Sequence, residues 1–222
     1  MRAVKEVSSL YITGAADDGP RDDDSSAFSA VTAVLEGTRP VLCEVQALVC
    51  RPDAASAEPA GAGGRFVSRE YYGIDPRRAK MLLAIVSSSV RIDVSSWDVF
   101  VNITGGLRIR DPAADLGIAC SIVASRLRRR IRAGTLVLGE LGLGGELRPV
   151  QQMDRRLAEA ARYGFARAIV PAHPGAGDRG PAPAVDSSLQ VVRVRTLREA
   201  VLRALESKEE AARRAAPAPL AD

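Results

Sequence analysis

Lysine and histidine are almost missing from this sequence, and each scarcity excludes a class of mechanism. Lys5, Lys80 and Lys208 are the only lysines, and His173 is the only histidine. A site that needs two histidines cannot be built, and a lysine late in the chain exists only near its end. We therefore expect no multi-histidine metal centre, and we interpret His173 as a surface-loop residue and not as a catalytic one.

Cysteine is scarce too, and no run of 18 apolar residues occurs. Cys43, Cys50 and Cys120 form no CxxC pair and no zinc-type Cys/His spacing. An odd number of cysteines without a secretory hydrophobic region favours reduced thiols in an intracellular compartment. The sequence thus predicts a protein of a bacterial-type cytoplasm or an organelle. We expect no secretion, no membrane partner, no metal and no cofactor.

Aromatic residues make up only 4% of the chain, but hydrophobic residues reach 46% and charged residues 26%. These proportions are typical of a globular protein. The formal net charge is +4 and the isoelectric point is near 9.2. This mildly basic balance permits a nucleic-acid partner without requiring one.

The order of hydrophobic patterns predicts an α/β (α+β) fold around one core. Two β-rich runs, 28–36 and 39–49, are separated by Gly37-Thr38 and indicate a β-hairpin. The C-terminal half then alternates strands and helices. Three expected helices have a start signal: Asp75-Pro76, Asp111-Pro112 and the capping box from Thr196 to Glu199. A fourth, with Met153 and Leu157 on its apolar face, is expected to end at Gly164. In the helix after Asp111, the apolar spacing predicts one buried stripe, with Leu116, Ala119, Cys120, Val123 and Leu127.

Two polar features in the second half carry alternative interpretations. Five arginines are clustered at the end of the helix that follows Asp111: Arg126, Arg128, Arg129, Arg130 and Arg132. They either complement the helix macrodipole at a solvated end or form a nucleic-acid-binding patch that meets phosphates. Asp115 is an acid among apolar neighbours, and we favour a role in complementing the helix N-terminus.

Phosphate chemistry has little support in these residues. No GxxxxGK[ST] occurs, and the glycines of 139–145 lead into a strand, so a tight turn is the simpler interpretation. The sequence therefore predicts that this chain by itself does not hydrolyse ATP.

Three long motifs in order resemble one protein family. They read VFVNITGGLRIRDPAADLGIACSIVAS, then VLGELGLGGELRPV, then DRRLAEAARYGFARAIVP. They are similar to the C-terminal domain of the bacterial-type RadA/Sms DNA-repair family, which is itself similar to the proteolytic domain of Lon. The segments VKEVSSLYI and VLEGTRPVLCEVQALV resemble that family's link to its ATPase core. The resemblance covers about residues 1 to 206, and the family's zinc finger and RecA-like ATPase core have no counterpart in this sequence.

The resemblance implies a division of the chain and a test of its chemistry. It implies a linker or docking segment with an acidic loop over 1–27, a Lon-protease-like domain over 28–206 and a disordered tail over 207–222. Lon-type proteases use a serine within GPSAG and a lysine within a PIGGLKEK-like segment. Ala113 and Asp154 occupy those two positions here. Both are vestigial, and the resemblance therefore implies that the chain has no catalytic residue and is not an enzyme.

No other serine and lysine in the sequence are placed to replace the missing Ser–Lys dyad. Ser121 and Ser125 lie two and three turns along the same helix, and Lys80 lies on a different one. Arginine does not release its proton in the pH range in which such enzymes act, so it cannot serve as the base. Lon chemistry is therefore not expected from these residues.

The function implied by the resemblance is that of a non-catalytic scaffold in recombinational DNA repair. Such a domain assembles a homo-oligomer, a hexameric ring in the family, and supports an ATP-driven motor on branched or single-stranded DNA. The expected partners are further copies of the chain, DNA, and a RadA-like ATPase half or a recombinase. Two alternatives stay open: a divergent Lon-like serine peptidase, and an interaction module repurposed after losing its ATPase.

Overall fold

The computed structural model describes residues 28–52, 67–172, 189–207, 209 and 210 of the chain. The predicted segment 1–27, most of the tail and His173 lie outside the described residues, so the division of the chain into three parts stays a prediction. Among the described helices, none has the length and apolar character that a membrane crossing requires.

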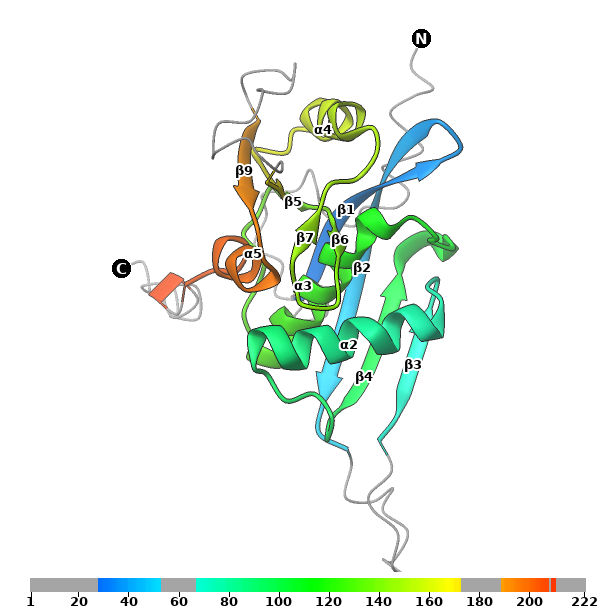
Figure 1. Ribbon diagram of the computed structural model, residues 1–222, viewed down its shortest axis with the longest axis vertical. Coiled ribbons are helices and arrows are strands. Elements are labelled where there is room, and N and C mark those ends of the chain that lie inside the picture. The colour runs from blue at the N-terminus through cyan, green and yellow to red at the C-terminus, as the bar shows by residue number, and fades with distance from the viewer. Residues whose placement is uncertain (1–27, 53–66, 173–188, 208, 211–222) are drawn as a thin grey trace, which may run out of the picture.

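The regular elements follow the order expected from the hydrophobic pattern (Figure 1). The strands are β1 (Ser29–Glu36), β2 (Arg39–Cys50), β3 (Arg69–Tyr72), β4 (Asp98–Ile103), β5 (Thr135–Val137), β6 (Glu140–Leu141), β7 (Leu147–Arg148), β8 (Arg167–Pro171) and β9 (Gln190–Val194). The helices are α2 (Pro76–Val90), α3 (Asp115–Leu127), α4 (Met153–Arg162) and α5 (Leu197–Ala204), with 3₁₀ turns η3 (Thr104–Gly106) and η4 (Pro112–Ala114).

Seven strands form one sheet in the order β3-β4-β2-β1-β5-β8-β9, and β6 pairs with β7 in a separate hairpin. The predicted hairpin of β1 and β2 is antiparallel, as is the β2–β4 pair. The other four neighbouring pairs, β3–β4, β1–β5, β5–β8 and β8–β9, are parallel. The predicted α/β class is confirmed: α2 joins the parallel strands β3 and β4, and α4 lies between the parallel strands β5 and β8.

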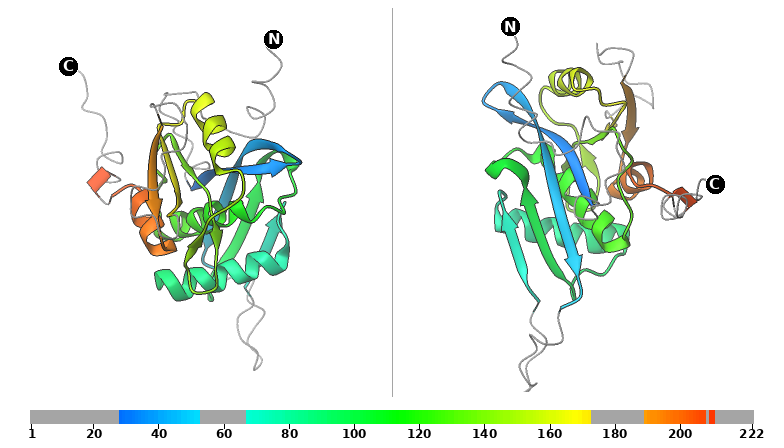
Figure 2. Two further views of the ribbon diagram at one scale, coloured as in Figure 1. Left: turned by 45° about the horizontal axis from the view of Figure 1, so that its top comes forward. Right: turned by 180° about the vertical axis from the view of Figure 1, so that it is seen from behind.

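Helices cover the two faces of this sheet unequally (Figure 2). Residues of α2, α3 and α5 share one apolar cluster with Val45, Val101 and their neighbours on the strands. Leu157 and Ala160 of α4 pack on the opposite face, against Ala33 and Leu42. On the face that α4 covers, this helix lies over β1 and the first part of β2. The last part of β2 and strands β4 and β3 have no described helix on that face.

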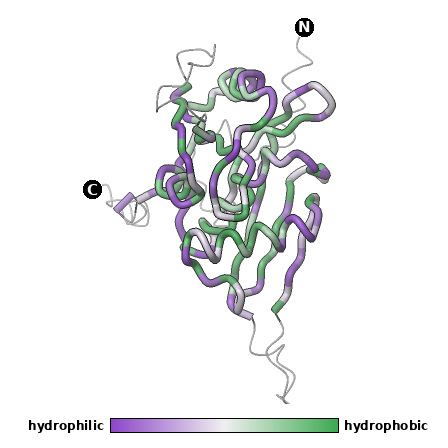
Figure 3. Tube along the Cα trace, in the orientation of Figure 1, coloured by the Kyte–Doolittle hydropathy of each residue, from purple (hydrophilic) through white to green (hydrophobic). Residues whose placement is uncertain are grey.

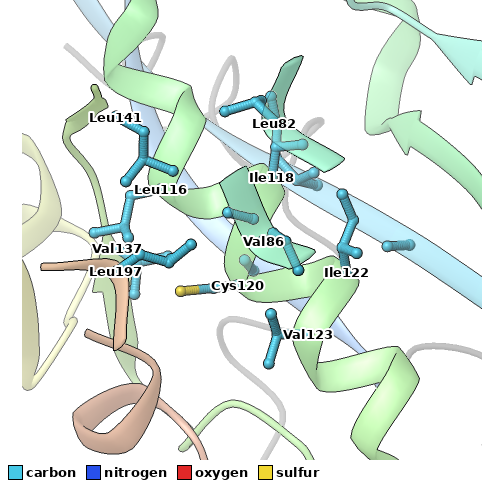
Figure 4. Packing of buried hydrophobic residues seen from close by; sticks show 14 of the residues in the cluster. Leu82, Val86, Leu116, Ile118, Cys120, Ile122, Val123, Val137, Leu141 and Leu197 are labelled. Carbon is cyan, nitrogen blue, oxygen red and sulfur yellow. The ribbon is translucent and has the colours of Figure 1, made fainter. Parts of the chain in front are cut away.

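Helix α3 is buried on nearly every side, and this differs from the predicted stripe. Every residue from Asp115 to Ser125 is buried, whereas Leu127 is 38% exposed. Figure 4 shows the reason: α2 on one side and Val137, Leu141 and Leu197 on another enclose the apolar side chains of α3. Sequence periodicity describes a helix with one covered face, and it fails for a helix enclosed between a sheet and other helices.

The buried thiols agree with the expectation of reduced cysteines. Cys43 and Cys120 are free and buried, and Cys50 is half-buried. Burial raises the pKa of Cys43 and Cys120 to about 12, so both stay protonated and act as small apolar side chains.

Candidate functional site

The segment Asp111–Asp115 connects the sheet to the start of α3, and its backbone is fixed on both sides. The Asp111 carboxylate accepts hydrogen bonds from the N–H groups of Ala113 (3.0 Å) and Leu35 (2.8 Å). The N–H of Gly139 donates to the carbonyl of Ala113 (2.9 Å), and the N–H of Leu116 donates to that of Gly139 (3.1 Å). The segment is therefore held between β1 and the residues that follow β5.

A buried arginine of α4 pairs with the first acid of this segment. The Arg156 side chain is 1% exposed, and its guanidinium lies 2.7 Å from the carboxylate of Asp111, which is 14% exposed. Arg156 also donates to the carbonyls of Ala33 and Gln151. A charge this deep is tolerated only when it is paired and hydrogen-bonded. Asp111 and Arg156 thus tie α4 to β1 and η4.

The second acid of the segment pairs with a different arginine. Asp115 is 2% exposed and accepts two hydrogen bonds from Arg78 of α2, one of them 2.9 Å long at Nε, and one of 3.1 Å from the N–H of Leu141. Burial raises the pKa of Asp115, although the hydrogen bonds from Arg78 and Leu141 act in the opposite direction. Asp115 in turn raises the pKa of Arg78. The sequence interpretation of Asp115 as a simple complement to the helix dipole is therefore incomplete, because the buried Asp115 carboxylate forms an ion pair with Arg78.

The two vestigial positions of the resemblance have unlike surroundings. Ala113 is fully buried, whereas Asp154 is exposed in the first turn of α4. A methyl group and a solvated carboxylate form no nucleophile–base pair. The ion pair Asp111–Arg156 uses residues two positions away from each of them, so this part of the fold is held by a structural contact.

Ser121 and Ser125, the alternative serines, also have structural roles. Both are fully buried. The Ser121 hydroxyl donates to the carbonyl of Ile118 (2.9 Å), and the Ser125 hydroxyl accepts from the N–H of Val49 (2.8 Å). Lys80, the lysine considered with them, is exposed on α2. The geometry therefore favours no serine-peptidase site among these residues.

The arginine cluster at the end of α3 makes intramolecular contacts. Arg126 stacks on the Trp97 ring at 3.9 Å and donates to the carbonyl of Asp93 (3.0 Å). The other contacts run from Arg128 to the Phe28 ring (5.5 Å), from Arg129 to the carbonyl of Glu206 (2.7 Å at Nε), and from Arg132 to the carbonyl of Arg203 (2.9 Å) and the carboxylate of Glu210 (3.0 Å). Arg130 is half-buried and also has a contact. These contacts bind the end of α3 to the end of α5, and the predicted nucleic-acid role of the cluster stays a prediction.

A groove that the sequence reasoning missed lies at the carboxyl ends of the parallel strands β3 and β4. Two adjoining cavities, of about 400 and about 320 Å³, share Ile74, Asp75, Ile109 and Arg110 in their linings. Tyr72 and Arg108 line the first cavity, and Arg78 and Asp115 line the second. We call this surface the β3–η4 groove. Crevices at the carboxyl ends of parallel strands are common ligand sites.

Two backbone segments that line the groove lie close together. The N–H of Ile109 donates to the carbonyl of Gly73 (2.7 Å), and Ile74 forms a parallel bridge with Ile109. Gly73 has φ +83°, and a Cβ there would lie 2.5 Å from the carbonyl oxygen of Leu107. Only glycine fits this position.

The exposed charged residues of the β3–η4 groove are two arginines and one carboxylate, that of Asp75. Arg108 and Arg110 are exposed on either side of the buried Ile109, and neither pairs with a carboxylate among the residues that the structure describes. Asp75 caps α2 by accepting from the N–H groups of Arg77 and Arg78. Tyr72 is 60% exposed beside the arginines. Arginines that alternate with a buried residue, just after Gly105-Gly106, are the signal by which the sequence could have revealed this surface.

Comparison with known proteins places these residues among relatives. Residues 75–174 match the model of the family described as subunit ChlI of Mg-chelatase. The DNA repair protein RadA of Mycolicibacterium smegmatis is 42% identical over 78% of this chain and 33% of its own length. RadA of Aquifex aeolicus is 39% identical over 77% of the chain and 34% of its length, and RadA of Pseudomonas aeruginosa is 35% identical over 90% and 39%. The chain spans about a third of the length of these relatives.

These matches correct one prediction. The sequence reasoning took the chain for a non-enzyme, because it lacks GxxxxGK[ST] and has Ala113 and Asp154 at the dyad positions. That conclusion is wrong, since the family that matches 75–174 is that of a chelatase subunit, part of an enzyme, and the RadA proteins match most of the chain. The reason for the error is that the absence of two motifs does not exclude other catalytic chemistry.

The extent of these matches leads to one assignment. The chain is a domain related to the DNA repair protein RadA.

Proposed function

We propose that this chain is the assembly and DNA-contacting domain of a RadA-type DNA repair enzyme that hydrolyses ATP. The name of its relatives supports the repair process. Because the chain spans about a third of those relatives, the proposal assigns ATP hydrolysis to the enzyme as a whole and gives this domain the task of building the assembly and holding DNA.

The observation that carries the DNA contact is the β3–η4 groove. Arg108 and Arg110 present two exposed guanidiniums on one edge, and the exposed Tyr72 offers a flat aromatic face beside them. Arginine binds backbone phosphates, and an aromatic ring stacks with an unpaired base of any identity. This combination fits single-stranded DNA better than it fits a duplex, whose bases are already stacked.

The Lon-like character of the domain is proposed for its architecture. The resemblance places Ala113 and Asp154 at the dyad positions, where we found a buried methyl group and an exposed carboxylate. The Asp111–Arg156 pair joins η4 to α4, and the Asp115–Arg78 pair joins the start of α3 to α2. A rigid junction of this kind suits a domain that passes force between subunits, and a homo-oligomeric ring is the assembly that we propose for it.

Reversing the charge of the groove is expected to abolish most DNA binding. In Arg108→Glu/Arg110→Glu, the affinity for a fluorescent single-stranded oligonucleotide should fall at least about tenfold at low salt. The slope of log affinity against log salt should shrink by about 1.4, because each lost phosphate contact on a single strand contributes about 0.7. Fluorescence anisotropy over a salt series measures both quantities.

The control makes the same charge change elsewhere. In Arg91→Glu/Arg155→Glu, two exposed arginines are replaced outside the groove, at the end of α2 and on α4. This variant should bind DNA with an affinity within about threefold of that of the wild type, since salt screens charges that lie far from the groove. An unchanged affinity in the groove variant, or a loss of binding in Arg128→Glu alone, would reject the groove and point to the arginine cluster.

A further inference from the structure

One face of the sheet has exposed apolar residues with no described helix above them. Leu48 of β2 pairs with Phe100 of β4, which pairs with Glu70 of β3. Two residues along, Gln46, Asn102 and Tyr72 form the next row on the same face. Leu48 is 46% exposed and Tyr72 is 60% exposed. We call these six residues, with Asp98, the sheet face.

The sheet face is acidic at its margin. Its charged members are Glu70 and Asp98, and it has no basic member. In the right view of Figure 2, β2, β4 and β3 stand in front of α2, and no described element crosses them. In Figure 3 the edge strand β3 is mainly hydrophilic, so the apolar centre of the face lies inward, on β2 and β4.

A surface with an exposed leucine among basic residues lies at the other end of the sheet. Helix α5 follows β9, the last strand, and packs inward through Leu197, Ala200, Val201 and Ala204. Its outward side has Leu202, which is 65% exposed, between the exposed Arg198 and Arg203. Arg195, just before the helix, is exposed as well, and Glu199 is the one carboxylate among them. We call Arg195, Arg198, Leu202 and Arg203 the α5 surface.

We propose that the sheet face of one copy of this chain docks on the α5 surface of the next copy. The inference rests on the assembly role proposed above and names the surfaces that carry it. An apolar centre with an acidic margin meets a leucine among arginines, so both the charges and the apolar groups are complementary. Pairing of like surfaces is disfavoured, because it brings Glu70 to Glu70 or Arg198 to Arg198.

The position of the two surfaces sets the form of the assembly. They lie at opposite ends of the seven-stranded sheet, beside β3 and beside β9 (Figures 1 and 2). Contact between two different surfaces is heterologous, and repetition of such a contact gives a closed ring or an open filament. Each copy then uses one sheet face and one α5 surface. Tyr72 belongs to both the sheet face and the β3–η4 groove, whereas Arg108 and Arg110 of the groove belong to neither docking surface.

Two blocking variants test this arrangement by their masses, alone and mixed. Leu48→Arg blocks the sheet face, and Leu202→Glu blocks the α5 surface. Each variant alone should lose assembly and scatter light as a single chain of 23.5 kDa. An equal mixture should give a species of twice that mass and nothing larger, because only one intact sheet face and one intact α5 surface remain to pair. Both replaced residues are exposed, and circular dichroism verifies that the variants fold.

The control and the contrary outcomes separate this inference from the proposed function. Leu143→Arg, at the 73% exposed tip of the β6–β7 hairpin, should keep the wild-type mass. If the wild type assembles and the blocking variants keep its mass, or if their mixture stays monomeric, the two surfaces are wrong and the assembly role stands. If the wild type itself is a monomer, the assembly role fails together with this inference.

Discussion

Replacing Arg156 with methionine is expected to lower the free energy of unfolding by about 3–5 kcal/mol, the usual cost of removing one partner of a buried ion pair. The Arg156 side chain is 1% exposed, and its loss removes the cation paired with Asp111 and one donor from each of the carbonyls of Ala33 and Gln151. Urea unfolding followed by circular dichroism measures the change as a lower midpoint at unchanged slope.

The neighbouring arginine provides the matched control. Arg155 is exposed on α4 and makes only surface contacts with Thr38 and Gln152. Arg155→Met should change the free energy of unfolding by about 0.5 kcal/mol or less. An Arg156→Met variant as stable as Arg155→Met would show that the buried pair does not hold α4 on the sheet.

Replacing Arg78 with methionine is expected to destabilise the protein by about 3 kcal/mol near neutral pH. This is the lower end of the usual range for a broken buried pair, because Arg78 is 34% exposed and water already weakens its attraction to Asp115. The loss should shrink on acidification. Without its cation, the buried Asp115 has a folded-state pKa raised still further above the unfolded value, and it binds a proton more tightly when folded.

The sign of this pH dependence follows from proton binding. A raised folded-state pKa stabilises the folded chain at low pH, and that contribution is lost as the pH rises through the folded-state value. The stability difference between wild type and Arg78→Met should therefore grow between about pH 4 and about pH 7. In Arg78→Met/Asp115→Asn the titrating group is gone, so its difference from the wild type should vary much less. A constant deficit in the single variant would refute the assignment of the ion pair.

Local features of the fold were predictable, because their signals lie within a few residues. The Asp75 side chain caps α2, and the Thr196 side chain accepts from the N–H of Glu199 at the start of α5, as their positions in the sequence predicted. The Asp111 cap was also anticipated, although the turn after it is 3₁₀ and α3 begins at Asp115. Each depends on a side chain that bonds to a nearby backbone N–H.

The candidate site was less predictable, because its partners are far apart in the chain. Arg78 pairs with Asp115 and Arg156 pairs with Asp111, and no periodic pattern connects such residues. The arginine cluster shows a second limit of sequence reasoning, and its nucleic-acid role stays a prediction. Its density suggested a nucleic-acid surface, but the ring of Trp97 and the carbonyls near the end of α5 engage most of its guanidiniums. Local charge density alone does not reveal which charges have partners.

The resemblance to the RadA/Sms family supplied the most accurate prediction and also the largest error. Three motifs in order led to the family that the comparisons then matched. The inference from missing motifs to a non-enzyme failed, because the chain spans only about a third of the length of its relatives and the matched family is that of a chelatase subunit. Residues that are present locate a domain within a family, whereas residues that are absent say little about the protein that contains it.

The mass of this chain in solution tests the central claim most directly. Light scattering on the wild type, with and without a single-stranded oligonucleotide at low salt, gives the assembly state and the DNA complex in one experiment. We predict a mass several times 23.5 kDa, near that of a ring of about six chains, and a salt-sensitive increase when DNA is added. A single chain of 23.5 kDa at every concentration, with no change on adding DNA, would contradict the proposed role.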